Sequence, residues 1–256
     1  MSANGELDRI LAFQATVDEG AAERVSEWEF GTAVLSPSLP RVWDANYTRL
    51  RPGAEAEAEA VAAAAGAVAG AAGMAHVSIV AREQDAARIG PGLQRLGFDR
   101  TRHVIMALCR RPDPPALEVS EVAREEVEAS RAETTLEFTP GNHELVAQLA
   151  ELDRRLARSI GGRWFAIVEA GEVASRAWLL DAGGIGQVED VATTPSKRKR
   201  GYARAVVSAA AIASRDAGND VTFIVADADD TVPDLYRRIG FEAIGFTERF
   251  VRRSDA

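Results

Sequence analysis

Thiols and imidazoles are scarce in this chain of 256 residues. Cys109 is the only cysteine, which excludes an intrachain disulfide and any site that needs several thiolates, and which fits a reducing compartment. Its place at the end of the apolar run Val104–Cys109 predicts a small buried hydrophobe. The three histidines lie far apart and none belongs to an H-x-x-x-H pair, so no metal site is expected.

The chain has fewer positively than negatively charged side chains. Thirty Lys and Arg residues face 39 Asp and Glu residues, and the net charge of −9 opposes a main role in binding nucleic acid or an anionic membrane. The first 30 positions carry acidic residues where a secretory signal needs a basic start, and the uncharged stretch Ala60–Ala81 is mostly Ala and Gly, which makes a poor membrane span. We therefore expect a cytoplasmic protein without nucleic-acid or membrane partners, and a homodimer is allowed.

Proline is concentrated at one point of the chain. Three prolines in four residues, within Arg111–Pro115, cannot continue a helix or a central strand. The length also suits two domains of roughly 100 to 150 residues each. We predict a first domain over residues 1–113 and a second over residues 117–256.

The second half alternates helical and strand patterns. Apolar residues at helical spacing predict two helices before a group of three strands, after which the chain changes period twice more. The expected helices cover residues 118–136, 142–159, 200–217 and 233–239, and the expected strands cover residues 164–168, 173–180, 186–193, 221–225 and 246–251.

The end of the first half repeats the end of the second. An Ala-rich helix over 54–70 is followed by a strand over 75–80, a helix over 86–96 and a strand over 101–109. Leu93–Phe98 aligns with Tyr236–Phe241 at an offset of 143 residues, and both segments end in Gly-Phe. The repeated order indicates an internal duplication.

A basic loop precedes the helix expected after the third strand. It contains Lys197 and Lys199, the only lysines of the chain, and three arginines close by. Gly201 stands where a helix begins, so its missing Cβ and the unpaired amides of the first turn could cradle a phosphate. By charge alone, a solvated loop or a nucleic-acid contact explains the cluster equally well.

The spacing favours the phosphate cradle, and the net charge of −9 disfavours the nucleic-acid contact. Arg198-x-x-Gly201-x-Ala203, which follows the strand ending at Val191–Pro195, resembles the acyl-CoA signature of the GNAT superfamily (Gcn5-related N-acetyltransferases). The segment Ala226–Phe241, with Leu235-Tyr236 followed by Ile239-Gly240-Phe241, resembles the closing segment of that superfamily. The resemblance begins near Leu117 and covers 135 to 140 residues.

The resemblance implies an α/β fold, with a mixed sheet that splays open between its fourth and fifth strands. Two tandem GNAT-like domains would have the acyl-CoA N-acyltransferase fold. Acetyl-CoA would lie in the opening, its pantetheine bonded to the main chain of Val191, Ala192 and Thr193. Its pyrophosphate would lie on the loop and helix start: Arg198, Lys199, Arg200, Gly201, Tyr202, Ala203 and Arg204.

Two catalytic residues follow from the resemblance. Tyr236 would protonate the departing thiolate, which a phenol with a pKa near 10 can do at about 3 Å from the sulfur; otherwise it only lines the pocket. Glu189 would be the general base, because strand alternation places it on the same face as Val191 and Thr193. An exposed strand carboxylate, with water as the base, is the alternative.

One departure from the superfamily pattern concerns the cofactor. Asp229 stands where an Asn is common, and it cannot donate an amide hydrogen to the cofactor. The expected function is acetyl transfer from acetyl-CoA to a primary amine of an unidentified small molecule. The alternative, favoured by Asp229, is a regulatory protein that binds CoA without turnover.

The first half resembles a decayed copy of the same fold. Asn46–Gly53 lacks the R-x-x-G-x-A spacing, and Leu93 stands at the tyrosine position, so no productive CoA binding is expected there. The segment Pro37–Tyr47 is rich in residues that line pockets, and it either touches the acceptor or fills a core.

Overall fold

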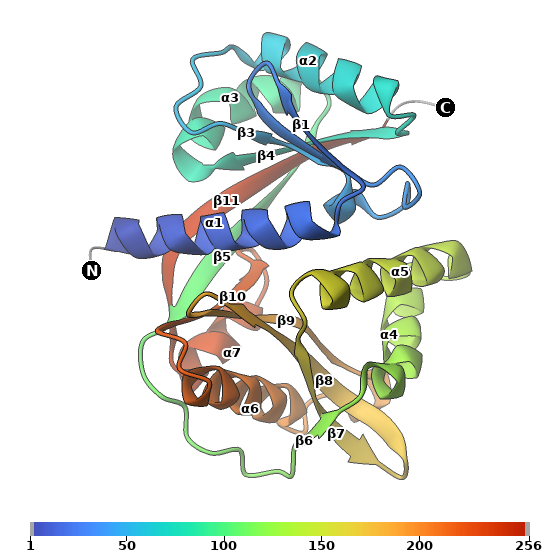
Figure 1. Cartoon of the computed structure of the whole chain (residues 1–256), viewed down its shortest axis with the longest axis vertical. Helices are drawn as coiled ribbons and strands as arrows, with labels where there is room; N and C mark the ends of the chain where they lie inside the picture. Colours follow the sequence, from blue (N-terminus) through green and yellow to red (C-terminus); the bar gives the residue numbers. More distant parts are fainter. Residues whose placement is uncertain (1–2, 254–256) are drawn as a thin grey trace.

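The computed structural model of the protein describes residues 3–253. Eleven strands in this part of the chain form one mixed sheet in the order β1-β2-β3-β4-β11-β5-β10-β9-β8-β7-β6 (Figure 1). The strands are β1 (Arg24–Trp28), β2 (Gly31–Leu35), β3 (Tyr47–Leu50), β4 (His76–Arg82), β5 (Asp99–Leu108), β6 (Ser120–Val122), β7 (Arg163–Glu169), β8 (Glu172–Ala182), β9 (Ile185–Thr193), β10 (Val221–Asp227) and β11 (Phe241–Arg253).

Helices cover both faces of the sheet. Those on one face, α2, α3, α6 and α7, share apolar clusters with the even-numbered residues Val104, Ile224 and Phe250. On the other face, α1, α4 and α5 pack against odd-numbered neighbours such as Ile105 and Phe223. The helices are α1 (Ala3–Ala21), α2 (Ala58–Ala71), α3 (Glu83–Arg95), α4 (Arg124–Phe138), α5 (His143–Ser159), α6 (Tyr202–Asp216) and α7 (Val232–Ile239), and the short 3-10 turns are η1 (Trp43–Ala45) and η2 (Pro195–Lys197).

The order of elements repeats along the chain. The series β1, β2, β3, α2, β4, α3, β5 of the first half returns as β7, β8, β9, α6, β10, α7, β11 in the second. This structural repetition extends the match of Leu93–Phe98 with Tyr236–Phe241 over both halves. No helix in residues 3–253 has the length and apolarity needed to cross a membrane.

The two halves exchange their last strands. β5, from the first half, pairs antiparallel with β10 of the second half, and β11, from the second half, pairs antiparallel with β4 of the first. β5 and β11 also pair with each other from Phe241–Leu108 to Val251–Asp99. The predicted boundary between residues 113 and 117 falls in a connecting segment without helix or strand, and the division into two domains stays a prediction, because the sheet itself is continuous.

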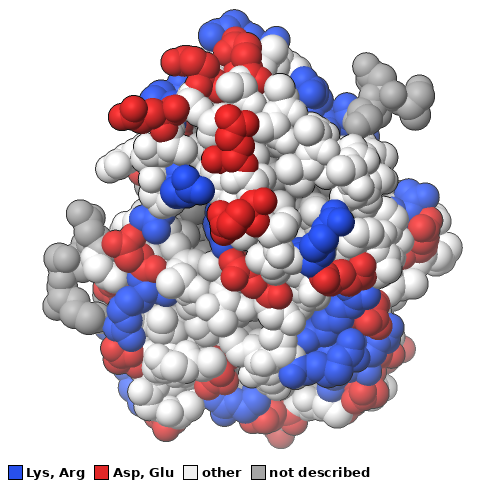
Figure 2. Space-filling view, turned by 45° about the horizontal axis from the view of Figure 1, so that its top comes forward, with Lys and Arg blue, Asp and Glu red and all other residues white. Residues whose placement is uncertain are grey.

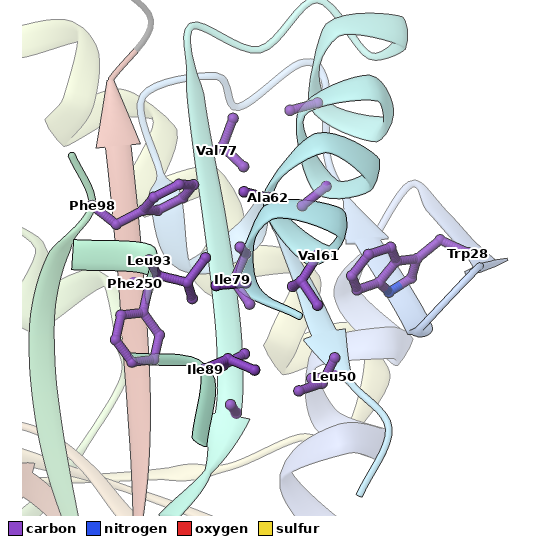
Figure 3. Close-up of a cluster of buried hydrophobic side chains, with 14 of the residues drawn as sticks. Trp28, Leu50, Val61, Ala62, Val77, Ile79, Ile89, Leu93, Phe98 and Phe250 are labelled. Atoms are coloured by element: carbon purple, nitrogen blue, oxygen red, sulfur yellow. The ribbon is translucent and has the colours of Figure 1, made fainter. Parts of the chain in front are cut away.

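Phe250 shows what the exchange does for the core. Its ring belongs to β11, yet it is fully buried among side chains of the first half, with Ile79, Ile89 and Leu93 around it (Figure 3). A Cβ added at Gly90 of α3 would meet Cζ of Phe250 at 2.9 Å, so the helix and the ring are in close contact. The second half therefore completes the core of the first.

Truncation of this ring should cost more stability than any surface change. Phe250→Ala is expected to lower the free energy of unfolding by about 3 to 5 kcal/mol, because it leaves a cavity inside the core. Phe138→Ala is the matched control, since that ring is 76% exposed, and it should change stability by less than about 0.5 kcal/mol. Urea unfolding of the two variants measures the difference, and equal losses would contradict the role given to β11.

The local predictions are mostly confirmed, with three differences. The helix expected over 118–136 is replaced by the short strand β6 followed by α4. α2 begins at Ala58 instead of residue 54, after a loop that α3 holds in place. The prediction of a buried Cys109 was wrong, because β5 ends at Leu108 and the thiol is exposed.

Candidate functional site

The sheet splits between β9 and β10. These two parallel strands pair only from Ile185–Val221 to Val188–Ile224, and beyond Val188 the edge of β9 that faces β10 is unpaired. The mixed sheet with a splay between the fourth and fifth strands of the second half is therefore confirmed. Val191, Ala192 and Thr193 lie on this separated part of β9, half-buried, where the resemblance placed the main-chain contacts of the cofactor.

A bulge lies at the start of the separated part. The register between β8 and β9 shifts between Trp178–Glu189 and Arg176–Ala192, and Asp190 has a left-handed φ of 46°. Directly paired residues share a face, so Glu189 lies on the face of Trp178 and Ala192. The expectation that Glu189 shares a face with Val191 and Thr193 was wrong, since the extra residue of the bulge reverses the alternation.

Two arginines hold Asp190 in the bulge. Arg176, only 2% exposed, donates from Nε at 2.8 Å to the Asp190 carboxylate. Arg131 of α4 reaches the same carboxylate at 3.1 Å and Asp153 of α5 at 2.9 Å. The two terminal nitrogens of Arg176 donate to the hydroxyls of Ser130 and Thr134 at 2.9 and 3.0 Å. This buried network fixes the backbone on which Glu189 stands.

The Glu189 side chain is accessible to solvent, yet the surrounding protein desolvates its carboxylate. Its side chain is exposed, yet the surrounding protein and the negative charge of Asp190 raise its pKa to about 7. Gln187 donates a hydrogen bond to it, which acts in the opposite direction. The carboxylate thus keeps access to solvent, and a pKa near neutrality suits a group that accepts and returns a proton.

Tyr236 approaches the split from the other face of the sheet. It lies on α7, and its side chain is 4% exposed. Within the described chain the hydroxyl makes no hydrogen bond, and it is not among the fully enclosed polar atoms without a partner. Burial, and then the nearby charge of Glu189, raise the pKa of Tyr236 well above its usual value, so the phenol keeps its proton.

The basic loop forms an open turn before α6. Lys199 and Gly201 both have left-handed φ angles, of 62° and 81°, and Gly201 is the N-cap residue of the helix. A Cβ built on Gly201 would meet nothing within 4 Å. Space in front of the first amides of α6 is what an anion cradle needs.

Much of the positive charge in this loop is neutralised inside the protein, which the sequence did not indicate. Lys197 donates to Glu169 at 2.6 Å, and the hydroxyl of Tyr202 donates to the same carboxylate. Arg198 forms a two-pronged pair with Glu137 of α4. Among residues 3–253, Lys199 and Arg204 have no ion pair, while Arg200 lies 3.9 Å from Glu169.

The other predicted cofactor residues are spread around the split. Ala203 lies half-buried in the first turn of α6. Asp229 is exposed in the turn before α7, where its backbone amide donates to the Asp227 carboxylate at 2.9 Å. The Asp229 side chain is thus directed by a local turn rather than by the core.

The corresponding place in the first half is filled by the protein itself. The amide of Gly53 donates to both carboxylate oxygens of Asp85, at 3.1 and 3.2 Å. Arg88 donates to the carbonyl oxygens of Ala54 and Ala56 in the same loop. Leu93, at the tyrosine position, is fully buried. The Asp85 carboxylate therefore already accepts the hydrogen bond that a phosphate would need from the Gly53 amide.

Two solved structures match nearly the whole chain. A conserved protein of unknown function from Staphylococcus epidermidis aligns with a TM-score of 0.67 at 13% identity, over 91% of this chain and 94% of its own. A GCN5-related N-acetyltransferase from Kribbella flavida aligns with a TM-score of 0.64 at 18% identity, over 97% and 95% of the two chains. This chain has the GNAT fold.

Further comparisons concern parts of the chain. A GCN5-related N-acetyltransferase from Sphaerobacter thermophilus aligns with a TM-score of 0.51 at 16% identity, over 71% of this chain and 61% of its own. The family described as FR47-like protein matches residues 165–251, which run from β7 to β11. No curated protein matches the sequence. The fold that the resemblance to the GNAT superfamily implied is confirmed.

The raised pKa of Glu189 has a measurable effect on stability. The carboxyl binds its proton up to about pH 7 in the folded chain, against 4.5 without the fold, so its stabilising effect is present at low pH and lost as the pH rises through 7. Glu189→Gln removes the cost of ionisation, and it should raise the melting temperature at pH 8 more than at pH 5.

Glu172→Gln, at the exposed start of β8, is the control for this pair of melting curves and should show no such dependence on pH. A gain for Glu189→Gln that is equal at the two pH values would show that the Glu189 carboxylate is as well solvated in the folded protein as in the unfolded chain.

Proposed function

We propose that this protein is an N-acetyltransferase that moves the acetyl group of acetyl-CoA to a primary amine of a small molecule by direct attack. The observation that carries the proposal is the split between β9 and β10, which has an anion cradle after β9. Beside it lies the Tyr236 hydroxyl, which makes no hydrogen bond to the residues that the structure describes. Structures of the same fold that are named N-acetyltransferases support acyl transfer in general. The exposed lone thiol of Cys109 fits the reducing conditions of the cytoplasm.

The chain offers acetyl-CoA two sets of contacts. The free edge of β9 at Val191, Ala192 and Thr193 would bind the pantetheine amides, as a neighbouring strand would. The amides that follow Gly201 would hold the pyrophosphate, helped by Lys199 and Arg204, which have no ion pair within residues 3–253. When bound, acetyl-CoA supplies the activated carbonyl carbon. Asp229, exposed in its turn, would face the cofactor with a carboxylate, which has no amide hydrogen to donate.

Glu189 and Tyr236 would move the protons. Amines are mostly protonated at neutral pH, and a carboxylate with a pKa of about 7 can take a proton from the acceptor nitrogen. The Tyr236 hydroxyl, which keeps its own proton, would donate it to the departing sulfur. Tyr236 packs with α6 and α7 whereas Glu189 faces the opposite side, so the donor and the acceptor of protons act from the two faces of the sheet.

A second candidate function is a regulatory protein that binds CoA without turnover. Asp229 favours this candidate, because a carboxylate there repels an anionic cofactor. Release of CoA thiol from acetyl-CoA across a panel of amines separates the two candidates. Thiol release with any amine supports the transferase, and CoA binding without release supports the regulatory protein.

The cradle can be tested with glycines at the two ends of one helix. Gly201 and Gly218 flank α6, both have left-handed φ angles (81° and 87°), and neither has a neighbour within 4 Å of an added Cβ. Gly201→Val should weaken CoA binding at least about tenfold more than Gly218→Val, because its side chain would block the phosphate. Calorimetry of the wild type should give one CoA per chain.

The same titration separates the contribution of the main-chain amides to CoA binding from that of the Lys197 side chain. Lys197→Ala should weaken CoA binding by no more than about 1 kcal/mol, since Lys197 is paired with Glu169 and partly exposed. Equal losses for Gly201→Val and Lys197→Ala would contradict a cradle of amides. A stoichiometry near two CoA molecules per chain would contradict the conclusion that the protein itself fills the corresponding place in the first half.

Tyr236→Phe should separate binding from turnover. The substitution keeps the ring and removes the proton, so acetyl-CoA affinity should stay nearly unchanged while turnover falls by roughly 10²-fold or more. Tyr202→Phe, which removes a hydroxyl bound to Glu169, should change turnover much less. If turnover of Tyr236→Phe is unchanged with the thioester step rate-limiting, Tyr236 only lines the pocket.

A further inference from the structure

One side of α4 carries polar residues toward the separated part of β9. Ser130, Thr134 and Glu137 are spaced by four and three residues, so they lie on one face of the helix. Ser130 and Thr134 are buried and accept hydrogen bonds from Arg176, which itself holds Asp190 in the bulge of β9. Glu137, near the end of α4, serves the segment that follows β9.

Arg198 joins that segment to α4. Each of the three nitrogens of its guanidinium binds the protein. Nη1 donates to Glu137 at 2.8 Å, Nη2 donates to the other oxygen of the same carboxylate, and Nε donates to the carbonyl oxygen of Thr193 at 3.2 Å. Thr193 is the last residue of β9. The Arg198 side chain therefore connects the end of the separated strand with the helix.

Both members of this ion pair are charged at neutral pH. The hydrogen bond from Arg198 lowers the pKa of the Glu137 carboxyl, and the hydrogen bond to Glu137 raises the pKa of Arg198. A two-pronged pair between a guanidinium and a carboxylate has a defined geometry, which a single contact of a lysine lacks. The pair can therefore fix the position of what it connects.

An ion pair alone does not mark a functional place on this protein. Figure 2 shows acidic and basic side chains interspersed over the face in view, and exposed pairs of this kind contribute little to stability. The pair of Glu137 and Arg198 differs from them because the same guanidinium also binds a main-chain oxygen at the end of a strand.

The contacts of α4 with β9 begin where β9 leaves β10. Arg131 of α4 contacts Asp190 at 3.1 Å, two residues past the last pair between β9 and β10. Arg198 reaches Thr193 at the end of β9 and is itself held by α4. Between these two contacts, the edge of β9 that faces β10 is unpaired. The separated part of β9 is thus attached to α4 at both ends.

Resting on the proposed binding of CoA, we infer that Glu137 and Arg198 form a clasp that keeps the end of β9 against α4, so that its free edge is in place before the pantetheine binds. In this role Arg198 acts through Thr193 rather than by contact with the pyrophosphate. Glu137 is then a positioning residue for the cofactor site. The clasp makes and breaks no covalent bond.

The sign of one substitution distinguishes a clasp from a mere charge near the cofactor. CoA carries several negative charges, so loss of a nearby carboxylate without another role should strengthen its binding. Glu137→Gln keeps the size of the side chain but removes the two-pronged pair, and the clasp predicts that CoA binds about fivefold more weakly or worse. Calorimetric titration with CoA measures the change.

Glu133→Gln is the matched control. Glu133 is exposed one turn before Glu137, and it makes no hydrogen bond or ion pair with residues 3–253. The hydrogen bond to Glu137 raises the pKa of Arg198 most, and the charge of Glu133 adds to this, so both carboxylates lie near the guanidinium. CoA should bind to Glu133→Gln as tightly as to the wild type, or more tightly. Tighter binding to Glu137→Gln, or equal weakening of the two variants, would overturn the inference.

A double substitution tests whether Arg198 acts through Glu137. Arg198→Gln should weaken CoA binding, and the addition of Glu137→Gln should cause no further loss, because the two residues share one contact. Losses that add up would show that each residue affects CoA independently, and they would overturn the clasp.

Hydrogen exchange of the cofactor-free protein reports on the clasp itself. The amides of Thr194, Lys197 and Arg198 bond to main-chain oxygens around the end of β9. In Glu137→Gln they should exchange at least about threefold faster than in the wild type, while Glu133→Gln leaves them unchanged. The amides of β4 in the first half are the internal reference. Wild-type exchange in Glu137→Gln would overturn the inference.

Failure of the proposed function would look different. If the wild type binds no CoA, transfer from acetyl-CoA is wrong, and hydrogen exchange alone decides whether Glu137 and Arg198 hold β9. If CoA binds and the variants at residues 133 and 137 behave alike, the proposed function stands and the clasp is overturned.

Discussion

The exchange of β5 and β11 is the constraint on which both the core and the candidate site depend. Backbone pairing carries β11 into the first half, where Phe250 fills the core on one face. On the opposite face the same strand brings Arg249 to the turn η1 and to Asp44. β5 belongs to the first half but pairs with β10 of the second, where it places His103 beside Asp227 at the split. One arrangement of strands thus positions both the hydrophobic interior and the polar side chains beside the split.

Within that frame, the position of Glu189 depends on a charged network that faces away from the solvent. Arg176 and Arg131 converge on Asp190, and they offset the cost of burying its carboxylate beside a bulge. Removal of either arginine would take away part of this compensation next to Glu189. The Asp190 carboxylate, which anchors the bulge, also raises the pKa of Glu189. Asp190 therefore affects both the position of Glu189 and its affinity for a proton.

Local patterns predicted the local elements well. Helical spacing predicted α5, and apolar runs separated by glycine turns predicted β7, β8 and β9. The splay followed from the resemblance. The strand exchange could not be predicted, because pairing between distant strands leaves no local period. The bulge at Asp190 involves no glycine, and α1 was not anticipated. One signal was available: Arg176 in the middle of an apolar strand pointed to a buried partner.

The strand exchange also affects how the chain folds during its synthesis. The ladder between β4 and β11 joins His76 to Arg253, so the first half leaves the ribosome with one edge of β4 unpaired and with no ring in the place of Phe250. Such an edge invites pairing with other chains until β11 is synthesised. Completion of the sheet therefore waits for the synthesis of β11, and closure over this long stretch of sequence makes slow folding and a need for chaperones the expected behaviour during biosynthesis.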